Sequence, residues 1–132
     1  MTVKILLDTH IFLWYISADL RLPAEVRDAI RDPENEAFLS VASVWEAVIK
    51  HALRRLDLPE APAKYLPRQR EAHRIATLLV DEDSLSFLAD LPQLHRDPFD
   101  RILVAQAQQH GLRLATVDEA VRAYPIPLLP AR

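Results

Sequence analysis

The sequence predicts an α/β fold built on a central, largely parallel sheet of about five strands. Short apolar runs, of the kind that form strands buried on both faces, recur along the chain. Between them lie segments whose apolar residues have helical spacing. This alternation is typical of parallel sheets, because each parallel connection needs a crossover, which is usually a helix.

The elements follow in order from this pattern. The first predicted strand is the run VKILLD, which ends on Asp8. Four further apolar runs predict strands at 36–40, 75–80, 112–116 and 126–129. Helical spacing predicts helices at 9–17, 23–31, 43–54, 60–73, 83–90, 98–110 and 118–123.

Proline and glycine positions agree with these boundaries. Pro23 and Pro98 suit the first position of a helix, and Gly111, the only glycine, suits a left-handed helix C-cap. Because the chain has a single glycine, it cannot form a Gly-rich phosphate loop. Walker-type nucleotide binding and the dinucleotide-binding fingerprint are therefore excluded.

Length and composition predict one compact domain over residues 1–132, since the chain has 132 residues and half of them are hydrophobic. There is no cysteine, so a bound metal must be held by oxygen or histidine ligands. Asp8 interrupts the N-terminal apolar run too early for a signal peptide, and no later run has the roughly 20 apolar residues of a membrane span. We therefore expect a cytoplasmic protein with no membrane partner.

The charge is unevenly distributed. The net charge of -3 argues against non-specific coating of nucleic acid. Between positions 50 and 74, however, bases outnumber acids, and this segment is either a solvated helical face or a phosphate-binding surface. Its bases are Lys50, Arg54, Arg55, Lys64, Arg68, Arg70 and Arg74.

Acidic residues recur where predicted strands pass into helices. Asp8 ends the first strand, Glu46 lies in the helix after the second, Asp97 and Asp100 open the long helix, and Asp118 follows the fourth strand. In a parallel α/β sheet such junctions gather beyond the carboxyl ends of the strands. We therefore expect these side chains to meet.

A second interpretation is that these acids only cap helices, because helix N-termini favour negative charge. Ser43 and Glu46 fit a capping box, and Asp97 before Pro98 fits an N-cap. Asp8 fits this interpretation less well, since a carboxylate that ends a buried strand must be compensated for the loss of hydration.

Convergence of the acids would predict a hard divalent cation, because clustered carboxylates repel one another unless a cation neutralises them. Mg²⁺ or Mn²⁺ fits an all-oxygen site better than zinc does. The five histidines show no pair at metal-ligand helical spacing, so we do not expect them to be ligands. Carboxylates and such a cation indicate phosphoryl chemistry.

Two reactions fit this chemistry, namely phosphorylation of Asp8 as a nucleophile and metal-assisted hydrolysis of a phosphodiester. Aspartyl-phosphate enzymes of the relevant classes need a lysine late in the chain, whereas the last lysine here is Lys64. The phosphatase pattern also needs an aspartate at position 10, where this chain has His10. Hydrolysis of a phosphodiester is the better prediction.

Four segments resemble, in order, the motifs of the PIN-domain family, and within it the VapC-type toxins of bacterial toxin–antitoxin pairs. They are LLDTHIFLW, SVASVWEAVIK, HRDPFDRILVAQA and LATVDEAV. The third is quite specific, and the others gain weight from their order. The resemblance covers essentially the whole chain and implies a three-layer α/β/α sandwich around a parallel sheet. It also implies a Mg²⁺- or Mn²⁺-dependent ribonuclease that cuts tRNA or ribosomal RNA, a homodimer and a cognate antitoxin.

The resemblance also assigns roles to individual residues. Asp8, Glu46, Asp100 and Asp118 match the four family acids, with Asp8 and Asp100 as principal metal ligands and Glu46 and Asp118 completing the site. Asp97 is an additional acid of this branch, and Thr9 and Thr116 match hydroxyls near the metal. Cleavage is expected to leave a 5′-phosphate and a 3′-hydroxyl.

We further expect Arg54, Arg55, Arg68 and Arg70 to guide RNA towards the acids, and Phe12, Trp14, Trp45 and Tyr15 to make core or dimer contacts. Two alternatives remain. The chain could be a non-catalytic α/β binding module, or a PIN nuclease that acts on DNA or processes RNA outside a toxin pair.

Overall fold

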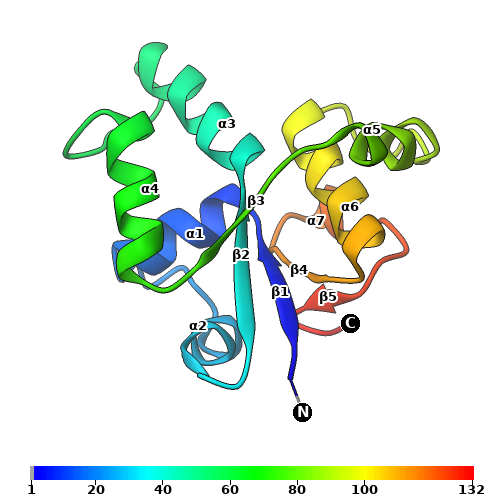
Figure 1. Ribbon diagram of the computed structural model, residues 1–132, viewed down its shortest axis with the longest axis horizontal. Coiled ribbons are helices and arrows are strands. Elements are labelled where there is room, and N and C mark those ends of the chain that lie inside the picture. The colour runs from blue at the N-terminus through cyan, green and yellow to red at the C-terminus, as the bar shows by residue number, and fades with distance from the viewer. Residues whose placement is uncertain (1) are drawn as a thin grey trace.

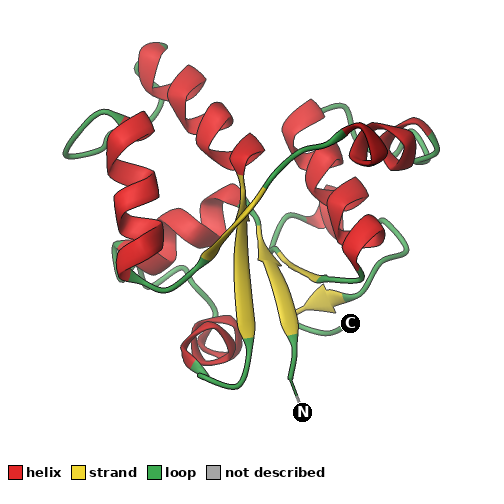
Figure 2. Ribbon diagram, in the orientation of Figure 1, coloured by secondary structure: helices red, strands yellow, loops and turns green. Residues whose placement is uncertain are grey.

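A computed structural model describes residues 2–132 as a parallel sheet with helices on both faces (Figures 1 and 2). The strands are β1 (Lys4–Leu7), β2 (Glu36–Ser40), β3 (Ala76–Leu78), β4 (Arg113–Ala115) and β5 (Leu128–Leu129). The helices are α1 (Thr9–Ile16), α2 (Ala24–Arg31), α3 (Val41–Ala52), α4 (Pro62–Ala72), α5 (Glu82–Ala89), α6 (Pro98–His110) and α7 (Glu119–Arg122).

The strands lie in the order β3-β2-β1-β4-β5, and every neighbouring pair is parallel. The chain therefore builds the sheet outwards from β1 in one direction through β3, and returns to the other side of β1 with β4. In open α/β sheets, the crevice at such a reversal, outside the carboxyl ends of the strands, is where ligands bind. Here the crevice lies beyond Leu7 and Ala115, which are paired in the register of β1 and β4.

Alternate residues of β1 pack into two separate hydrophobic cores, because successive side chains of a strand point to opposite faces. Leu6 lies in the core beneath α6 and α7, together with Leu103, Leu114 and Tyr124. Ile5 and Leu7 lie in the other core, beneath α1, α2 and α4. Burial on both faces explains why β1 reads as a continuous apolar run.

The predicted three-layer α/β/α architecture is confirmed, and the predicted ends of all the elements lie within two residues of the observed ones. Gly111 ends α6 with a φ of 65°, in the left-handed region that favours glycine. Pro98 opens α6 as predicted, whereas Pro23 is the N-cap of α2 and not its first residue. Within residues 2–132, the structure contains no helix that is both long and apolar enough to cross a membrane.

Candidate metal centre

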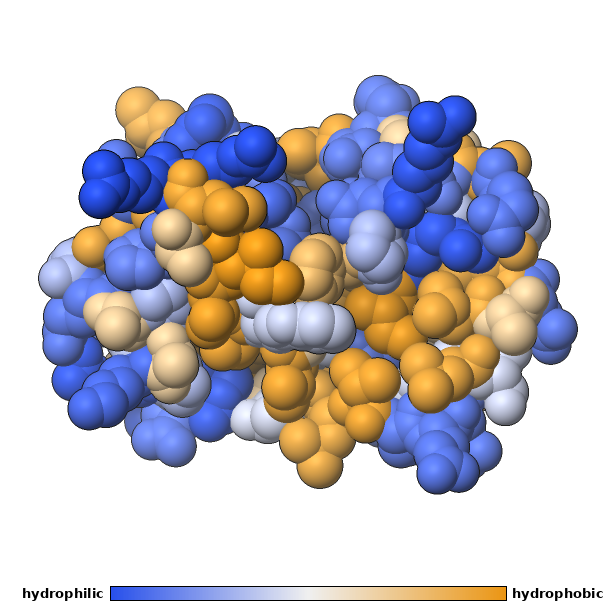
Figure 3. Space-filling model, turned by 90° about the horizontal axis from the view of Figure 1, so that it is seen from above, coloured by the Kyte–Doolittle hydropathy of each residue, from blue (hydrophilic) through white to orange (hydrophobic). Residues whose placement is uncertain are grey.

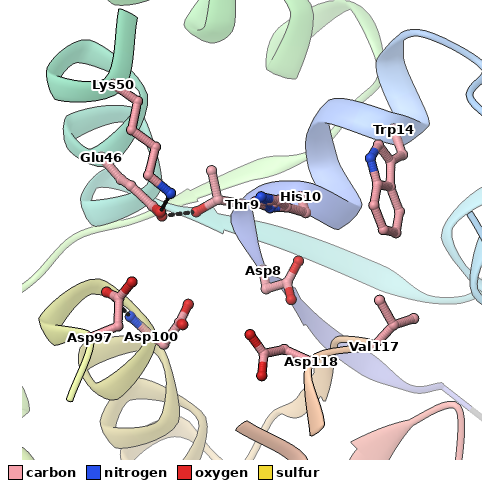
Figure 4. Close-up of a pocket in the computed structure, with 10 residues that line it drawn as sticks. All are labelled: Asp8, Thr9, His10, Trp14, Glu46, Lys50, Asp97, Asp100, Val117 and Asp118. Carbon is pink, nitrogen blue, oxygen red and sulfur yellow. Dashed lines mark hydrogen bonds and ion pairs between the residues drawn. The ribbon is translucent and has the colours of Figure 1, made fainter. Parts of the chain in front are cut away.

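A pocket of about 320 Å³ lies in the crevice at the sheet reversal (Figure 4). It is surrounded by acids that come from the end of β1, from α3, from the start of α6 and from the turn between β4 and α7. The structure therefore brings together all five acids predicted from the sequence. The lining residues are Asp8, Thr9, His10, Trp14, Glu46, Lys50, Asp97, Asp100, Val117 and Asp118.

Asp8 lies where β1 ends and α1 begins, and its side chain is the N-cap of α1. Its Oδ1 accepts a hydrogen bond from the backbone N–H of Ile11 at 2.8 Å. The residue is 7% exposed. Burial raises the pKa of Asp8, and the hydrogen bonds from Thr116 and Ile11 offset only part of this effect. The carboxylate thus carries a desolvation cost that a cation in the pocket would relieve.

Asp97 directly precedes α6 and Asp100 lies in its first turn, and the two have different surroundings. Asp97 caps the helix, since its Oδ1 accepts hydrogen bonds from the N–H groups of Phe99 at 2.8 Å and Asp100 at 3.3 Å. Asp100 Oδ2 lies 2.8 Å from His95 Nε2. Burial raises the pKa of Asp100 to about 6, and the negative charges of Asp97, Glu46 and Asp8 add to this rise while His95 opposes it.

Asp118 caps α7, the helix that follows β4. Its Oδ1 accepts a hydrogen bond from the N–H of Ala120 at 2.9 Å. The hydroxyl of the fully buried Thr116 accepts a hydrogen bond from the Asp118 N–H at 3.1 Å, and Thr116 also bonds to the Asp8 side chain. Thr116 therefore joins the acids that follow β1 and β4.

The predicted capping box of Ser43 and Glu46 is wrong. The N-cap of α3 is Ser40, whose hydroxyl accepts from the N–H of Ala42 at 3.1 Å, so the helix begins at Val41. Glu46 consequently lies inside α3, more than one turn from the helix N-terminus. Its burial, with 3% exposed, cannot be explained by capping.

Both carboxylate oxygens of Glu46 are held by side chains. The Thr9 hydroxyl donates to Oε1 at 2.6 Å, and Lys50 Nζ lies 2.5 Å from Oε2 (Figure 4). Burial alone would lower the pKa of Lys50, but the hydrogen bond and charge of Glu46, with the charges of Asp97 and Asp100, outweigh it and raise that pKa. Thr9 thus lies at the site as predicted, and Lys50 joins it.

Sequence reasoning assigned no part in this site to Lys50 or to His95. Lys50 follows Glu46 by four residues, a spacing at which helical side chains meet, so this pair could have been found. Among the described residues, His95, Asp97 and Asp100 form the one group of three His, Asp or Glu side chains with ligand atoms within 4.8 Å of one another. His95 therefore lies within reach of the acids, and the expectation that no histidine is a ligand stays a prediction.

The four arginines predicted to guide RNA are divided between two regions. Arg54 and Arg55 are exposed just beyond the end of α3. Arg68 pairs with Glu60 on the surface. Arg70 donates to the carbonyl of Ile75, just before β3, and so lies towards the amino ends of the strands, away from the acids.

The donor atoms of the pocket fit a hard divalent cation. Five carboxylates supply the oxygen ligands that Mg²⁺ and Mn²⁺ prefer, and the pocket has room for water beside an ion. Asp8 and Asp100 are partly desolvated carboxylates, and such an ion would balance their charge. Glu46 is already bonded through both oxygens and would act through water.

In the metal-free protein we expect Asp100 to lower the stability as the pH rises from about 4 to 6. The pKa of Asp100 is raised from 3.8 to about 6, so in this interval the folded protein keeps a proton that the unfolded chain releases. Asp100→Asn should flatten the profile and stabilise the protein at pH 7 by about 1 to 2 kcal/mol, a discounted figure because 20% of the Asp100 side chain is exposed. Urea unfolding in EDTA at several pH values measures this.

The matched control for this experiment is Asp57→Asn, which changes an exposed acid outside the pocket. That variant should follow the wild-type profile. An Asp100→Asn profile that runs parallel to that of the wild type between pH 4 and 6 would contradict the raised pKa of Asp100.

Comparison with known proteins agrees with the fold. The chain is 27% identical to Ribonuclease VapC22 of Mycobacterium tuberculosis, over 93% of each chain. The structure of VapBC2 from Rickettsia felis bound to a DNA fragment from their promoter contains a chain of the same fold, with a TM-score of 0.69, 14% identity and coverage of 96% of this chain and 97% of that chain. A toxin–antitoxin complex from Klebsiella pneumoniae gives a TM-score of 0.60 with 20% identity over 93% of each chain. The model of the PIN domain matches residues 5–126, and the chain therefore belongs to the PIN domain family.

Proposed function

We propose that this protein is a metal-dependent endoribonuclease of the VapC toxin type, which hydrolyses phosphodiesters of tRNA or ribosomal RNA in the cytoplasm. The observation that carries the proposal is the convergence of five acids from four separate parts of the chain on one pocket. Helix capping accounts for three of them but not for Glu46 or Asp100. The similarity to Ribonuclease VapC22 supports RNA as the substrate.

In this proposal Asp8 and Asp100 would be the principal residues that hold Mg²⁺ or Mn²⁺, and Glu46 and Asp118 would complete the site. A bound divalent ion lowers the pKa of water and offsets charge that develops on the phosphate. Asp97 holds the first turn of α6 in place through its cap, so that the Asp100 carboxylate faces Asp8. Thr9 and Thr116 fix the orientations of Glu46 and Asp8.

Asp8→Asn and Asp100→Asn should each lower RNA cleavage by about two orders of magnitude or more, because each removes charge where the proposed ion binds. The measurement is cleavage of total tRNA and ribosomal RNA at saturating Mg²⁺ and, separately, at saturating Mn²⁺. Circular dichroism should show an unchanged fold, since Asn can still accept the hydrogen bond that caps α1. Full activity in both variants would refute the assignment.

A Mn²⁺ titration followed by thermal unfolding tests the alternative of a non-catalytic module. A converged carboxylate site should raise the melting temperature of the wild type, and less so that of Asp8→Asn, because only the folded state offers the assembled ligands. Scattered helix caps would give no such gain. Cleavage of single-stranded DNA, but not of RNA, under the same conditions would instead favour a DNA nuclease.

The RNA backbone needs a basic surface near the pocket, because the acids alone repel it. We propose that Arg54 and Arg55 supply it. They follow α3, the helix that carries Glu46 and Lys50, and their side chains are exposed. Arg68 and Arg70 contribute less in this proposal, because Glu60 neutralises Arg68 and Arg70 lies towards the amino ends of the strands.

The double variant Arg54→Glu, Arg55→Glu should bind RNA more weakly and show a smaller dependence of affinity on salt, since each lost phosphate contact reduces the slope by about one. The matched variant Arg68→Glu, Arg70→Glu should change both quantities less. Binding is measured by fluorescence anisotropy with labelled tRNA and an Asp8→Asn background that prevents cleavage. Equal effects of the two double variants would contradict this placement.

We further propose two protein partners, a cognate antitoxin and a second copy of this chain. The similarity to chains of solved toxin–antitoxin complexes supports the antitoxin. An apolar groove of about 370 Å³ between α3, α5 and the start of α6 supports the homodimer. Apolar residues also gather on the face of the molecule that Figure 3 shows from above. The groove is lined by Val41, Ala42, Trp45, Val80, Leu85, Leu88, Pro98, Phe99 and Ile102.

Trp45→Glu should shift the protein from dimer towards monomer, because Trp45 is 61% exposed in the apolar groove and a charge there would be buried by the partner. Light scattering coupled to size-exclusion chromatography measures the mass. Leu20→Glu is the control, since Leu20 is fully exposed outside the groove. A wild type that is monomeric at all concentrations would show that the groove does not join two copies.

A further inference from the structure

The acidic pocket contains one residue with a permanent positive charge. Of the described residues that line it, Lys50 is the only lysine or arginine. Its side chain extends from α3 into the pocket, and Asp97 and Asp100 lie on the opposite wall (Figure 4). The side chain is 37% exposed, so the amine is open to the pocket.

The position of the Lys50 amine is fixed by Glu46. Lys50 Nζ lies 2.5 Å from Glu46 Oε2, and Thr9 holds the other oxygen of Glu46 at 2.6 Å. Glu46 is buried inside α3 and its carboxylate is held from both sides, so it anchors the amine at one place. An ammonium has three N–H donors, and the bond to Glu46 uses one of them. The others remain for a molecule that enters the pocket.

The substrate creates a need for such donors. A scissile phosphodiester carries a negative charge and must enter a pocket surrounded by five carboxylates, which a single divalent ion does not fully neutralise. The surface arginines near α3 can attract the backbone but lie outside this pocket. Lys50 supplies a fixed donor and a positive charge inside the pocket, where removal from water strengthens both effects.

We propose that Lys50 contacts a non-bridging oxygen of the scissile phosphate, with Glu46 holding its amine in position. This inference rests on the proposed nuclease function and deepens it, because it assigns a substrate-binding group that is not an acid. The competing explanation is structural, namely that Lys50 serves only to orient Glu46 as a ligand of the metal. The two explanations predict opposite effects on metal binding.

If Lys50 contacts phosphate, its removal eliminates a positive charge that repels the metal ion, so metal binding should become stronger. If Lys50 only orients Glu46, its removal should weaken metal binding. The variant is Lys50→Met, which keeps much of the length of the side chain without its charge. Lys50→Arg keeps the charge in a different shape. Lys4→Met is the control, because Lys4 is exposed at the start of β1, outside the pocket.

Three measurements are made on the full chain at pH 8. Calorimetric titration with Mn²⁺ alone should show binding by Lys50→Met that is about three- to tenfold tighter than in the wild type. Titration with adenosine 5′-monophosphate at saturating Mn²⁺ should show about 10- to 100-fold weaker binding, which corresponds to the loss of a hydrogen bond to a charged group. Cleavage of total tRNA should fall by a similar factor, and Lys50→Arg should restore part of both losses.

Lys4→Met should match the wild type in all three measurements. Weaker Mn²⁺ binding by Lys50→Met, or unchanged binding of adenosine 5′-monophosphate, would overturn the phosphate contact while the nuclease assignment stands. A wild type that neither binds Mn²⁺ nor cleaves RNA would instead refute the proposed function and, with it, this role of Lys50. The Lys50→Met variant therefore tests the phosphate contact, and the wild type tests the proposed nuclease function.

Discussion

Repulsion among five carboxylates around one pocket is the constraint on which the rest of the site depends. Three of them, Asp8, Asp97 and Asp118, each accept a backbone N–H at the start of a helix. The N-terminus of a helix favours negative charge, so these caps lower the cost of holding acids close together. Helix capping and cation binding are therefore not competing explanations, since the caps allow the charged pocket to form.

The side chains of the other two acids, Glu46 and Asp100, do not cap a helix, and they have different hydrogen-bond partners. The two carboxylate oxygens of Glu46 accept hydrogen bonds from Thr9 and Lys50. One oxygen of Asp100 lies within hydrogen-bond distance of His95, but the pKa of Asp100 is still raised to about 6. Asp100 is thus the less compensated of the two and gains more from a cation. This difference is the physical reason for placing Asp100 ahead of Glu46 as a ligand.

The sequence was sufficient to predict the sheet, because burial on both faces and alternation with helices leave a strong pattern in the apolar residues. It also predicted that Asp8, Glu46, Asp97, Asp100 and Asp118 would meet, since the junctions between parallel strands and the following helices gather at one edge. It could not place the N-cap of α3, because Ser40 and Ser43 are both suitable caps and only the direct passage from β2 into α3 selects Ser40. The charge pattern likewise could not separate Arg54 and Arg55 from Arg70, because all three belong to one basic segment of the sequence. In the fold, Arg54 and Arg55 follow α3, whereas Arg70 lies near the amino end of β3.

The apolar groove and the acidic pocket are both lined by residues of α3 and of the start of α6. Trp45 and Phe99 meet edge to face in the groove, with ring centroids 5.1 Å apart. Each ring is adjacent in sequence to an acid of the pocket, Trp45 to Glu46 and Phe99 to Asp100. An aromatic pair of this kind contributes about 0.5 to 1.5 kcal/mol beyond its burial, so it helps to hold the two helices at one separation. A partner that covers the groove would reinforce this contact, and the acids that follow the two rings in sequence would then keep their separation across the pocket.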